Sequence, residues 1–232
     1  MNKLISVNCT PFRNVKLVVF DVDGTLYDQS KLRKKMLKSL IGYYFLRPWK
    51  IKDLLIIHQF RLERETKAGF EAPNLNDKQY EWCADKLKLP IERVRSVIDK
   101  WIFNFPNKYL EACVYPGVKE TFDSLNKQNI KKAIYSDYDA NEKLVSMNLD
   151  ADLIVSSTDL NINAMKPIPK AINYILDEFK IADKSTVLFI GDRDELDGAC
   201  ARNAGIPYLI INKNEAKNNF YKILSKKILN ES

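Results

Sequence analysis

Five short, continuous apolar runs restrict most strongly how this chain can fold. They lie at residues 15–20 (VKLVVF), 131–135, 152–156, 186–190 and 207–211. Runs of this kind are typical of strands buried on both faces, as in parallel sheets covered by helices. Helical segments fit between most of the runs, so the sequence predicts an α/β fold with a Rossmann-like parallel sheet.

Helical spacing of apolar residues supports this alternation. Val118, Thr121, Phe122 and Leu125 follow the i, i+3, i+4, i+7 pattern, and residues 168–175 repeat it. Such a stripe marks one buried face of a helix. Each stripe lies between two expected strands, so helices should cover the sheet.

Residues 30–112 interrupt the alternation, because they contain helical patterns but no convincing buried-strand run. We predict an inserted all-helical cap domain at 30–112 and a core domain of 1–29 and 113–232. Breakers at Pro48, Gly69, Pro73 and Pro90 divide the insertion into about four helices. Two stripes should pack inside it, together with the aromatic group Tyr43, Tyr44, Phe45 and Trp49: Ile51, Leu54, Leu55 and His58, and Tyr80, Cys83, Ala84 and Leu87. We expect His58 to be a packed residue, not a catalytic base.

The composition fits a globular protein with a substantial core, since 46% of its 232 residues are apolar. The four cysteines, Cys9, Cys83, Cys113 and Cys200, show no metal-binding spacing, so free thiols are expected. The first 14 residues lack a secretory pattern, and no apolar run approaches the roughly 20 residues that cross a bilayer. We therefore expect a soluble, cytoplasmic protein without membrane insertion.

The net charge of +7 is concentrated in one segment. Residues 31–67 hold eleven Lys/Arg and three Asp/Glu, which accounts for the whole excess. A local positive field can attract an anionic substrate, a nucleic acid or an anionic membrane. A solvated helix face is an equally good reading, and these alternatives stay open here.

Chemically reactive side chains follow several of the expected strands, where ligands bind in open α/β sheets. Asp21 and Asp23 of DVDGTL follow the first run and Ser136 follows the second. Lys166 precedes a helix in MKPIPK, and Asp192 opens an acidic cluster after the fourth run. These residues supply two carboxylates, a hydroxyl, an ammonium and a set of oxygen ligands.

The order of DVDGTL, the Ser of IYSDYD, the Lys of MKPIPK and GDRDELDGACARNAG resembles the four motifs of the haloacid dehalogenase (HAD) superfamily. The resemblance spans residues 15 to about 212. Residues 30–112 resemble the type 1 helical cap of members such as phosphoglycolate phosphatase and β-phosphoglucomutase. The resemblance to the superfamily implies that Asp21 is a nucleophile that forms an aspartyl-phosphate and that Asp23 is a general acid and base. Because a phosphate dianion repels a carboxylate, attack also needs a cation, and the resemblance implies Mg²⁺ held by Asp21, the Asp23 carbonyl and Asp192.

Further roles follow from the same resemblance. Ser136 would bind phosphoryl oxygens, and Lys166 would offset negative charge. Substrate-binding residues would be Gly24, Thr25, Asp137 and Asp197, with Gly24 also allowing a tight turn. Asp197, with Asp194 or Glu195, would lie near the metal, and the sequence does not rank the last two. Asp137 departs from the usual small or neutral residue, so its carboxylate should turn away from phosphate or pair with a cation.

The predicted function is a Mg²⁺-dependent phosphohydrolase that acts on a small phosphorylated metabolite beneath a closing cap. Asp23 favours phosphate chemistry, since the dehalogenases lack an acid at that position. One alternative is a phosphomutase of the β-phosphoglucomutase kind. Another is a non-catalytic binding module that uses the basic segment, although a nucleic-acid partner is disfavoured. The sequence does not indicate the oligomeric state.

Overall fold

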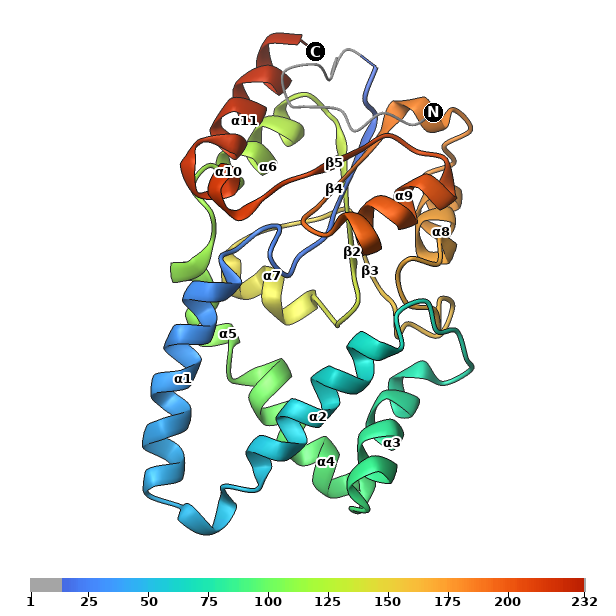
Figure 1. Ribbon diagram of the computed structural model, residues 1–232. Coiled ribbons are helices and arrows are strands. Elements are labelled where there is room, and N and C mark those ends of the chain that lie inside the picture. The colour runs from blue at the N-terminus through green and yellow to red at the C-terminus, as the bar shows by residue number, and fades with distance from the viewer. Residues whose placement is uncertain (1–13, 232) are drawn as a thin grey trace.

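A computed structural model describes residues 14–231, and the expectations for Cys9 and the first residues lie outside this range. Its centre is a five-stranded, fully parallel sheet in the order β3-β2-β1-β4-β5 (Figure 1). The strands are β1 Leu17–Phe20, β2 Lys131–Ser136, β3 Leu153–Ser156, β4 Val187–Gly191 and β5 Tyr208–Ile210. All five expected strands and the α/β fold are therefore confirmed.

The central strand β1 is buried on both faces, which explains its uninterrupted apolar sequence. Val18 and Phe20 point into the apolar cluster that includes α6 and α11. Leu17 and Val19 point into the cluster on the other face, which includes α8 and α9. The sheet thus forms the middle of three layers.

Helices cover both faces as the stripes predicted. The structure contains α6 Val118–Lys127, α7 Asn141–Met147, α8 Lys170–Glu178, α9 Ala199–Ala204, α10 Lys213–Asn218 and α11 Phe220–Glu231. The stripe of α6 is buried throughout, and in α8 the buried positions are Ala171, Ile172, Ile175 and Leu176. Ile168 packs at the edge of that cluster.

The segment between β1 and α6 is helical and lies beyond the ends of the strands (Figure 1). It contains α1 Gln29–Phe45, α2 Asp53–Thr66, α3 Leu75–Leu87, α4 Ile91–Ile98, a π-helical turn Asp99–Asn104 and the single-turn α5 Asn107–Leu110. Its two connections run side by side, since the Asp28 N–H donates to the Cys113 carbonyl at 2.9 Å. The Asp28 side chain also caps α1 by accepting from the Ser30 and Lys31 N–H groups.

Two packing expectations for this segment are wrong. Helix α2 begins only at Asp53, and it buries Ile56, Ile57 and Phe60, so Ile51, Leu55 and His58 are exposed. Of the aromatic group, Tyr44 is buried and Tyr43 packs edge-on against Trp101 at 5.0 Å. Phe45 and Trp49 are exposed instead. The stripe Tyr80, Cys83 and Ala84 is buried as expected.

The described cysteines Cys83, Cys113 and Cys200 are free, as predicted, and all three are buried. Within residues 14–231, none of the helices has both the length and the apolar character needed to span a bilayer.

Candidate active site

Parallel pairing brings the predicted reactive residues to one edge of the sheet. Strand β1 lies between β2 and β4, and Phe20 is in register with Ile134 and Ile190. Asp21, Ser136 and Asp192 therefore leave the sheet at nearly the same level. The loop before α8 adds Lys166 to this edge, although it lies 145 positions from Asp21.

Lys166 is the centre of a buried ion triad. Its Nζ donates to Asp21 Oδ1 at 2.7 Å and to Asp197 Oδ1 at 2.8 Å, and only 2% of the residue is exposed. Burial alone would lower the pKa of this ammonium, but Asp197 and Asp21 raise the pKa well above its usual value. Lys166 is therefore a fixed cation beside the expected nucleophile.

Asp21 has both carboxylate oxygens oriented by neighbours. Lys166 holds Oδ1, and the Thr25 hydroxyl donates to Oδ2 at 2.8 Å. Burial raises the pKa of Asp21 to about 8; Lys166 opposes this rise, whereas Asp197 and Asp192 add to it. The Asp21 carboxyl thus depends on added positive charge to be fully ionised at neutral pH.

Asp23 is in the opposite electrostatic state. Lys143 Nζ, at the start of α7, lies 2.7 Å from each carboxylate oxygen, and the Tyr27 hydroxyl donates to Oδ1. Burial would raise the pKa of Asp23, but Lys143 and Tyr27 hold it below its usual value. Sequence reasoning missed both partners; Tyr27 lies four positions from Asp23, whereas Lys143 lies 120 positions away with no spacing signal.

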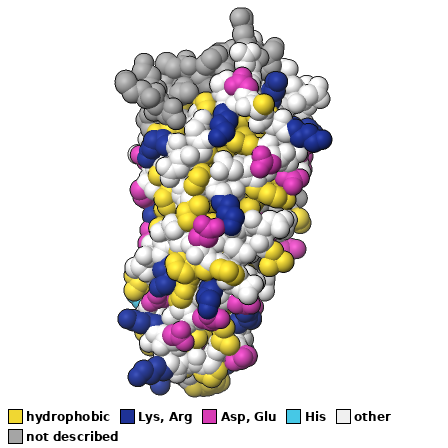
Figure 2. Space-filling view, turned by 90° about the vertical axis from the view of Figure 1, so that its right-hand side faces the viewer, with side chains coloured by type: hydrophobic (Ala, Val, Ile, Leu, Met, Phe, Trp, Pro, Cys, Tyr) yellow, Lys and Arg dark blue, Asp and Glu magenta, His cyan; other side chains and the backbone are white. Residues whose placement is uncertain are grey.

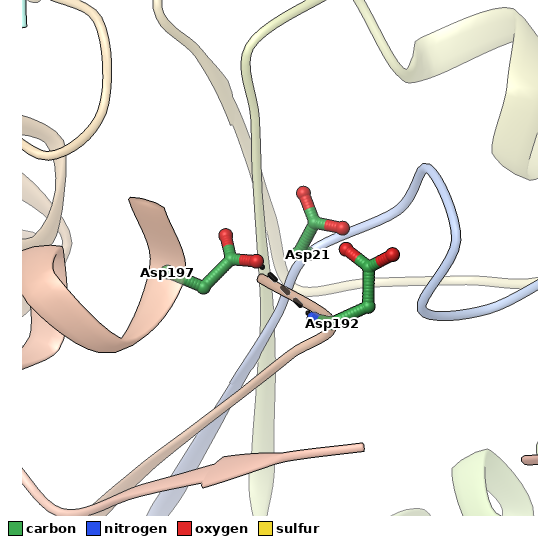
Figure 3. A group of neighbouring side chains, drawn as sticks. All are labelled: Asp21, Asp192 and Asp197. Carbon is green, nitrogen blue, oxygen red and sulfur yellow. Dashed lines mark hydrogen bonds between the residues drawn. The ribbon is translucent and has the colours of Figure 1, made fainter. Parts of the chain in front are cut away.

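Asp21, Asp192 and Asp197 form one carboxylate cluster, with an oxygen of each within 4.8 Å of the others (Figure 3). Asp197 is already occupied: Oδ1 accepts from Lys166, and Oδ2 accepts from the N–H groups of Asp192 and Arg193 at 3.2 and 3.0 Å. Asp192 accepts no hydrogen bond on its carboxylate from any residue in 14–231. Burial, and next Asp197, raise the pKa of Asp192 to about 6.

These carboxylates fit a hard divalent cation. The Asp192 carboxylate accepts no hydrogen bond from the described residues and lies next to Asp21, so its oxygens are available as metal ligands. Mg²⁺ prefers one or two carboxylates plus water and phosphate oxygens. A cation here would also oppose the burial and the mutual repulsion that raise the pKa values of Asp21 and Asp192.

The structure separates the remaining acidic residues. Asp194 pairs with Arg202 at 2.7 Å and Glu195 with Arg193 at 2.8 Å, and both side chains are exposed. Neither joins the cluster, so Asp197 is the third acidic member at the sheet edge.

Gly24 and Thr25 support the site from behind. Gly24 has φ of 99°, and a β-carbon there would lie 2.2 Å from Asp192 Oδ2, so only glycine fits. Ser136 is buried, and its hydroxyl accepts from the Tyr138 N–H at 3.3 Å. Gly24, Thr25 and Ser136 are not among the described residues that line the cavity between the sheet edge and the helical segment.

Asp137 does line the cavity, but its carboxylate is engaged. It accepts from the Ser157 hydroxyl at 2.6 Å and from the Lys166 N–H at 3.3 Å. The carboxylate is thus held by neutral donors, and the Asp137 carbonyl accepts from Arg64 of α2.

The cavity has a volume of about 540 Å³ and lies between the sheet edge and the helical segment. Its floor is charged, with Asp21, Asp23, Lys143, Lys166 and Asp192. The helical side combines apolar and charged residues. The apolar ones are Leu32, Met36, Leu37, Leu40, Ile57, Ala68, Trp101, Ile102, Pro106 and Leu110, and the polar or charged ones are Gln29, Arg33, Arg61, Arg64 and Glu65. A ligand in this cavity would therefore meet charged groups at the sheet edge, and both apolar and cationic side chains on the helical side.

Comparisons with known proteins identify the family and fold that this chain shares with others. A family model described as haloacid dehalogenase-like hydrolase matches residues 18–211. A probable D-glycero-D-manno-heptose-1,7-bisphosphate 7-phosphatase of Thermoplasma acidophilum is 37% identical over 78 residues, which is 31% of this chain and only 48% of that relative.

Two solved structures share the fold. A 2-haloacid dehalogenase from Pseudomonas syringae has a TM-score of 0.62 and 17% identity, with 91% of this chain and 99% of that chain covered. A HAD phosphatase from Thermococcus onnurineus has a TM-score of 0.58 and 20% identity, with 86% and 87% covered. Both confirm the fold at low sequence identity.

The raised carboxyl pKa values predict how stability depends on pH. The folded protein holds protons on Asp21 and Asp192 at pH values where the unfolded chain has lost them, so the free energy of unfolding falls as pH rises. In EDTA, thermal denaturation should show a falling melting temperature from pH 5 to pH 8. Asp21→Asn should flatten this slope, whereas Asp177→Asn, on the exposed side of α8, should retain it. If the melting temperature of Asp21→Asn fell with pH as steeply as that of the wild type, Asp21 would not be the carboxyl with the raised pKa.

Proposed function

Since the chain belongs to the haloacid dehalogenase-like hydrolase family, we propose that it is a Mg²⁺-dependent phosphohydrolase that cleaves a small phosphomonoester. The observation that carries this proposal is the Asp23–Lys143 pair beside the Asp21–Lys166 pair. Displacement of halide needs only a nucleophile, whereas displacement of an alkoxide also needs a proton donor. Asp23 lies two positions from Asp21 on the cavity floor and can supply that proton.

In the proposed reaction, an Asp21 oxygen attacks phosphorus as the bond between phosphorus and the ester oxygen breaks. An aspartyl-phosphate forms on Asp21, and the leaving oxygen takes a proton from Asp23. A bound Mg²⁺, held by the carboxylates of Asp21 and Asp192 and the Asp23 carbonyl, would supply charge neutralisation. Lys166 and Thr25 fix the orientation of the nucleophile.

The two protonation states of Asp23 follow from its surroundings. Lys143 holds the free carboxyl ionised, and an arriving phosphate dianion would raise its pKa and favour the acid form. After proton transfer, the carboxylate can take a proton from the water that hydrolyses the aspartyl-phosphate. Such acid–base assistance typically contributes about 10²- to 10⁴-fold.

Phosphoryl oxygens need donors at the end of β2. The Ser136 hydroxyl accepts from the Tyr138 N–H, which leaves its own proton free to donate. Ser136 therefore keeps its proposed role, with a small rotation toward the cavity on substrate binding. Asp137 would contribute its backbone, because its carboxylate is engaged by Ser157.

Hydrolysis of p-nitrophenyl phosphate tests the proposal directly. Turnover should require Mg²⁺ and stop in EDTA, and Asp21→Asn should lower kcat by at least about 10³-fold, because the amide cannot act as the nucleophile. Asp177→Asn should retain wild-type kcat. Full turnover in Asp21→Asn would sink the covalent mechanism, and metal-independent turnover would sink the Mg²⁺ requirement.

Lys143 provides a second test. Lys143→Met removes the cation that lowers the pKa of Asp23, so the acidic limb of the plot of kcat against pH should move to higher pH. This holds where hydrolysis of the aspartyl-phosphate limits turnover, because Asp23 must then be ionised. Lys143→Arg should restore the wild-type profile in large part. An unmoved limb in Lys143→Met would show that the pair does not control Asp23.

The apolar residues on the helical side of the cavity, called the apolar wall below, predict a preference among substrates. For a series of n-alkyl phosphates, KM should fall by up to about fourfold for each added methylene that the wall buries. Leu40→Gln, in the half-buried wall position, should weaken this dependence. Leu160→Gln, exposed and outside the cavity, is the control. A KM that is independent of chain length would contradict a productive apolar wall.

A further inference from the structure

The helical segment exposes an unusual concentration of large apolar side chains. Eight of the thirteen exposed large hydrophobic residues in the described chain lie between positions 37 and 62. We call seven of them the apolar corner: Leu37, Ile41, Phe45, Leu46, Trp49, Ile51 and Leu55. Their exposed fractions run from 51% for Ile51 to 83% for Phe45. A concentration of exposed apolar side chains of this kind indicates a binding surface.

The apolar corner is a projecting feature. Leu37, Ile41 and Phe45 are four positions apart and share one face of α1, while Leu32, Met36 and Tyr44 face inward. The 3₁₀ turn η2 Pro48–Lys50 then carries Trp49 outward before α2 begins. The α1–α2 connection lies at the end of the molecule farthest from the labelled chain ends (Figure 1). On the right-hand side of Figure 1, which is the side that Figure 2 shows, Lys and Arg side chains are interspersed with Asp and Glu.

Cations surround the apolar corner without acidic partners. Residues 30–52 contain eight Lys/Arg and no Asp or Glu. Lys34, Lys38, Arg47 and Lys52 are exposed, and none forms an ion pair with any residue in 14–231. The first acidic residue beyond them, Asp53, is buried and pairs with Arg93. The exposed side chains of residues 30–52 therefore combine apolar groups with charges of positive sign only.

We propose that the apolar corner docks on the surface of an anionic lipid bilayer. Trp and Phe side chains insert at the level of lipid headgroups, and neighbouring Lys and Arg attract anionic lipids. A two-fold contact between copies of this chain would place the positive surface against itself, which disfavours a second copy as the occupant. Leu37 belongs to both the apolar corner and the cavity wall, so docking would bring the cavity close to the bilayer.

Sedimentation of the full chain with lipid vesicles tests this proposal. The wild type should bind vesicles of phosphatidylcholine mixed with phosphatidylglycerol. It should bind much less to vesicles of phosphatidylcholine alone. Phe45→Ser/Trp49→Ser should lower the partition coefficient by at least about tenfold, and Lys38→Glu/Lys52→Glu by at least about 20-fold. The control Val145→Ser/Leu160→Ser removes exposed apolar residues elsewhere and should bind as the wild type does.

Folding and the competing occupants are checked in the same experiment. None of the four apolar corner and charge positions changed in the test variants lines the cavity, so hydrolysis of p-nitrophenyl phosphate should stay at the wild-type level. Emission from Trp49 should shift to the blue on binding, since Trp49 is exposed, whereas Trp101 is buried and Trp82 is half-buried against Phe70. Failure of the wild type to bind anionic vesicles would overturn the proposal, as would wild-type binding by Phe45→Ser/Trp49→Ser. So would self-association or nucleic-acid binding that requires Phe45 and Trp49 in the absence of vesicle binding.

Discussion

The buried ammonium of Lys166 is the interaction on which the site depends. Three carboxylates converge within 4.8 Å at the buried edge of a parallel sheet, where like charges repel and solvation is weak. Lys166 contacts two of them, Asp21 and Asp197, and thereby joins β1, the loop before α8 and the segment after β4. Removing one member of such a triad leaves buried charge without a partner, so the three segments are electrostatically interdependent.

The same edge also connects the sheet to the helical segment. Arg64 of α2 donates to the Asp137 carbonyl and stacks on Tyr138, with its guanidinium carbon 4.2 Å from the ring centre. Gly69 donates from its N–H to the Lys166 carbonyl at 2.8 Å. The loops that hold Asp137 and Lys166 are therefore in direct contact with the residues above the cavity. A change in the position of the helical segment would therefore displace the loops that hold Asp137 and Lys166.

Sequence patterns predicted the sheet well and the helical segment less well. Buried parallel strands need apolar residues on both faces, so β1 and β4 are recognisable as continuous runs. Helix α2 carries apolar residues around most of its circumference, and its buried face depends on neighbours such as α3 and α4. The stripe through Ile51 and His58 therefore had the right spacing and the wrong face. Phe45 and Trp49 look like core residues in sequence because their exposure is set only by the packing around them.

Sequence alone determined the residues that meet at the sheet edge, because parallel strands end at the same level and local motifs place Asp21, Lys166 and Asp192 just beyond them. The tertiary structure decided their electrostatic state. Lys143 reaches Asp23 from 120 positions away, and Arg202 and Arg193 draw Asp194 and Glu195 out of the cluster. Charge interactions depend on distance in space and on burial, and neither quantity is encoded in the spacing of residues along the chain.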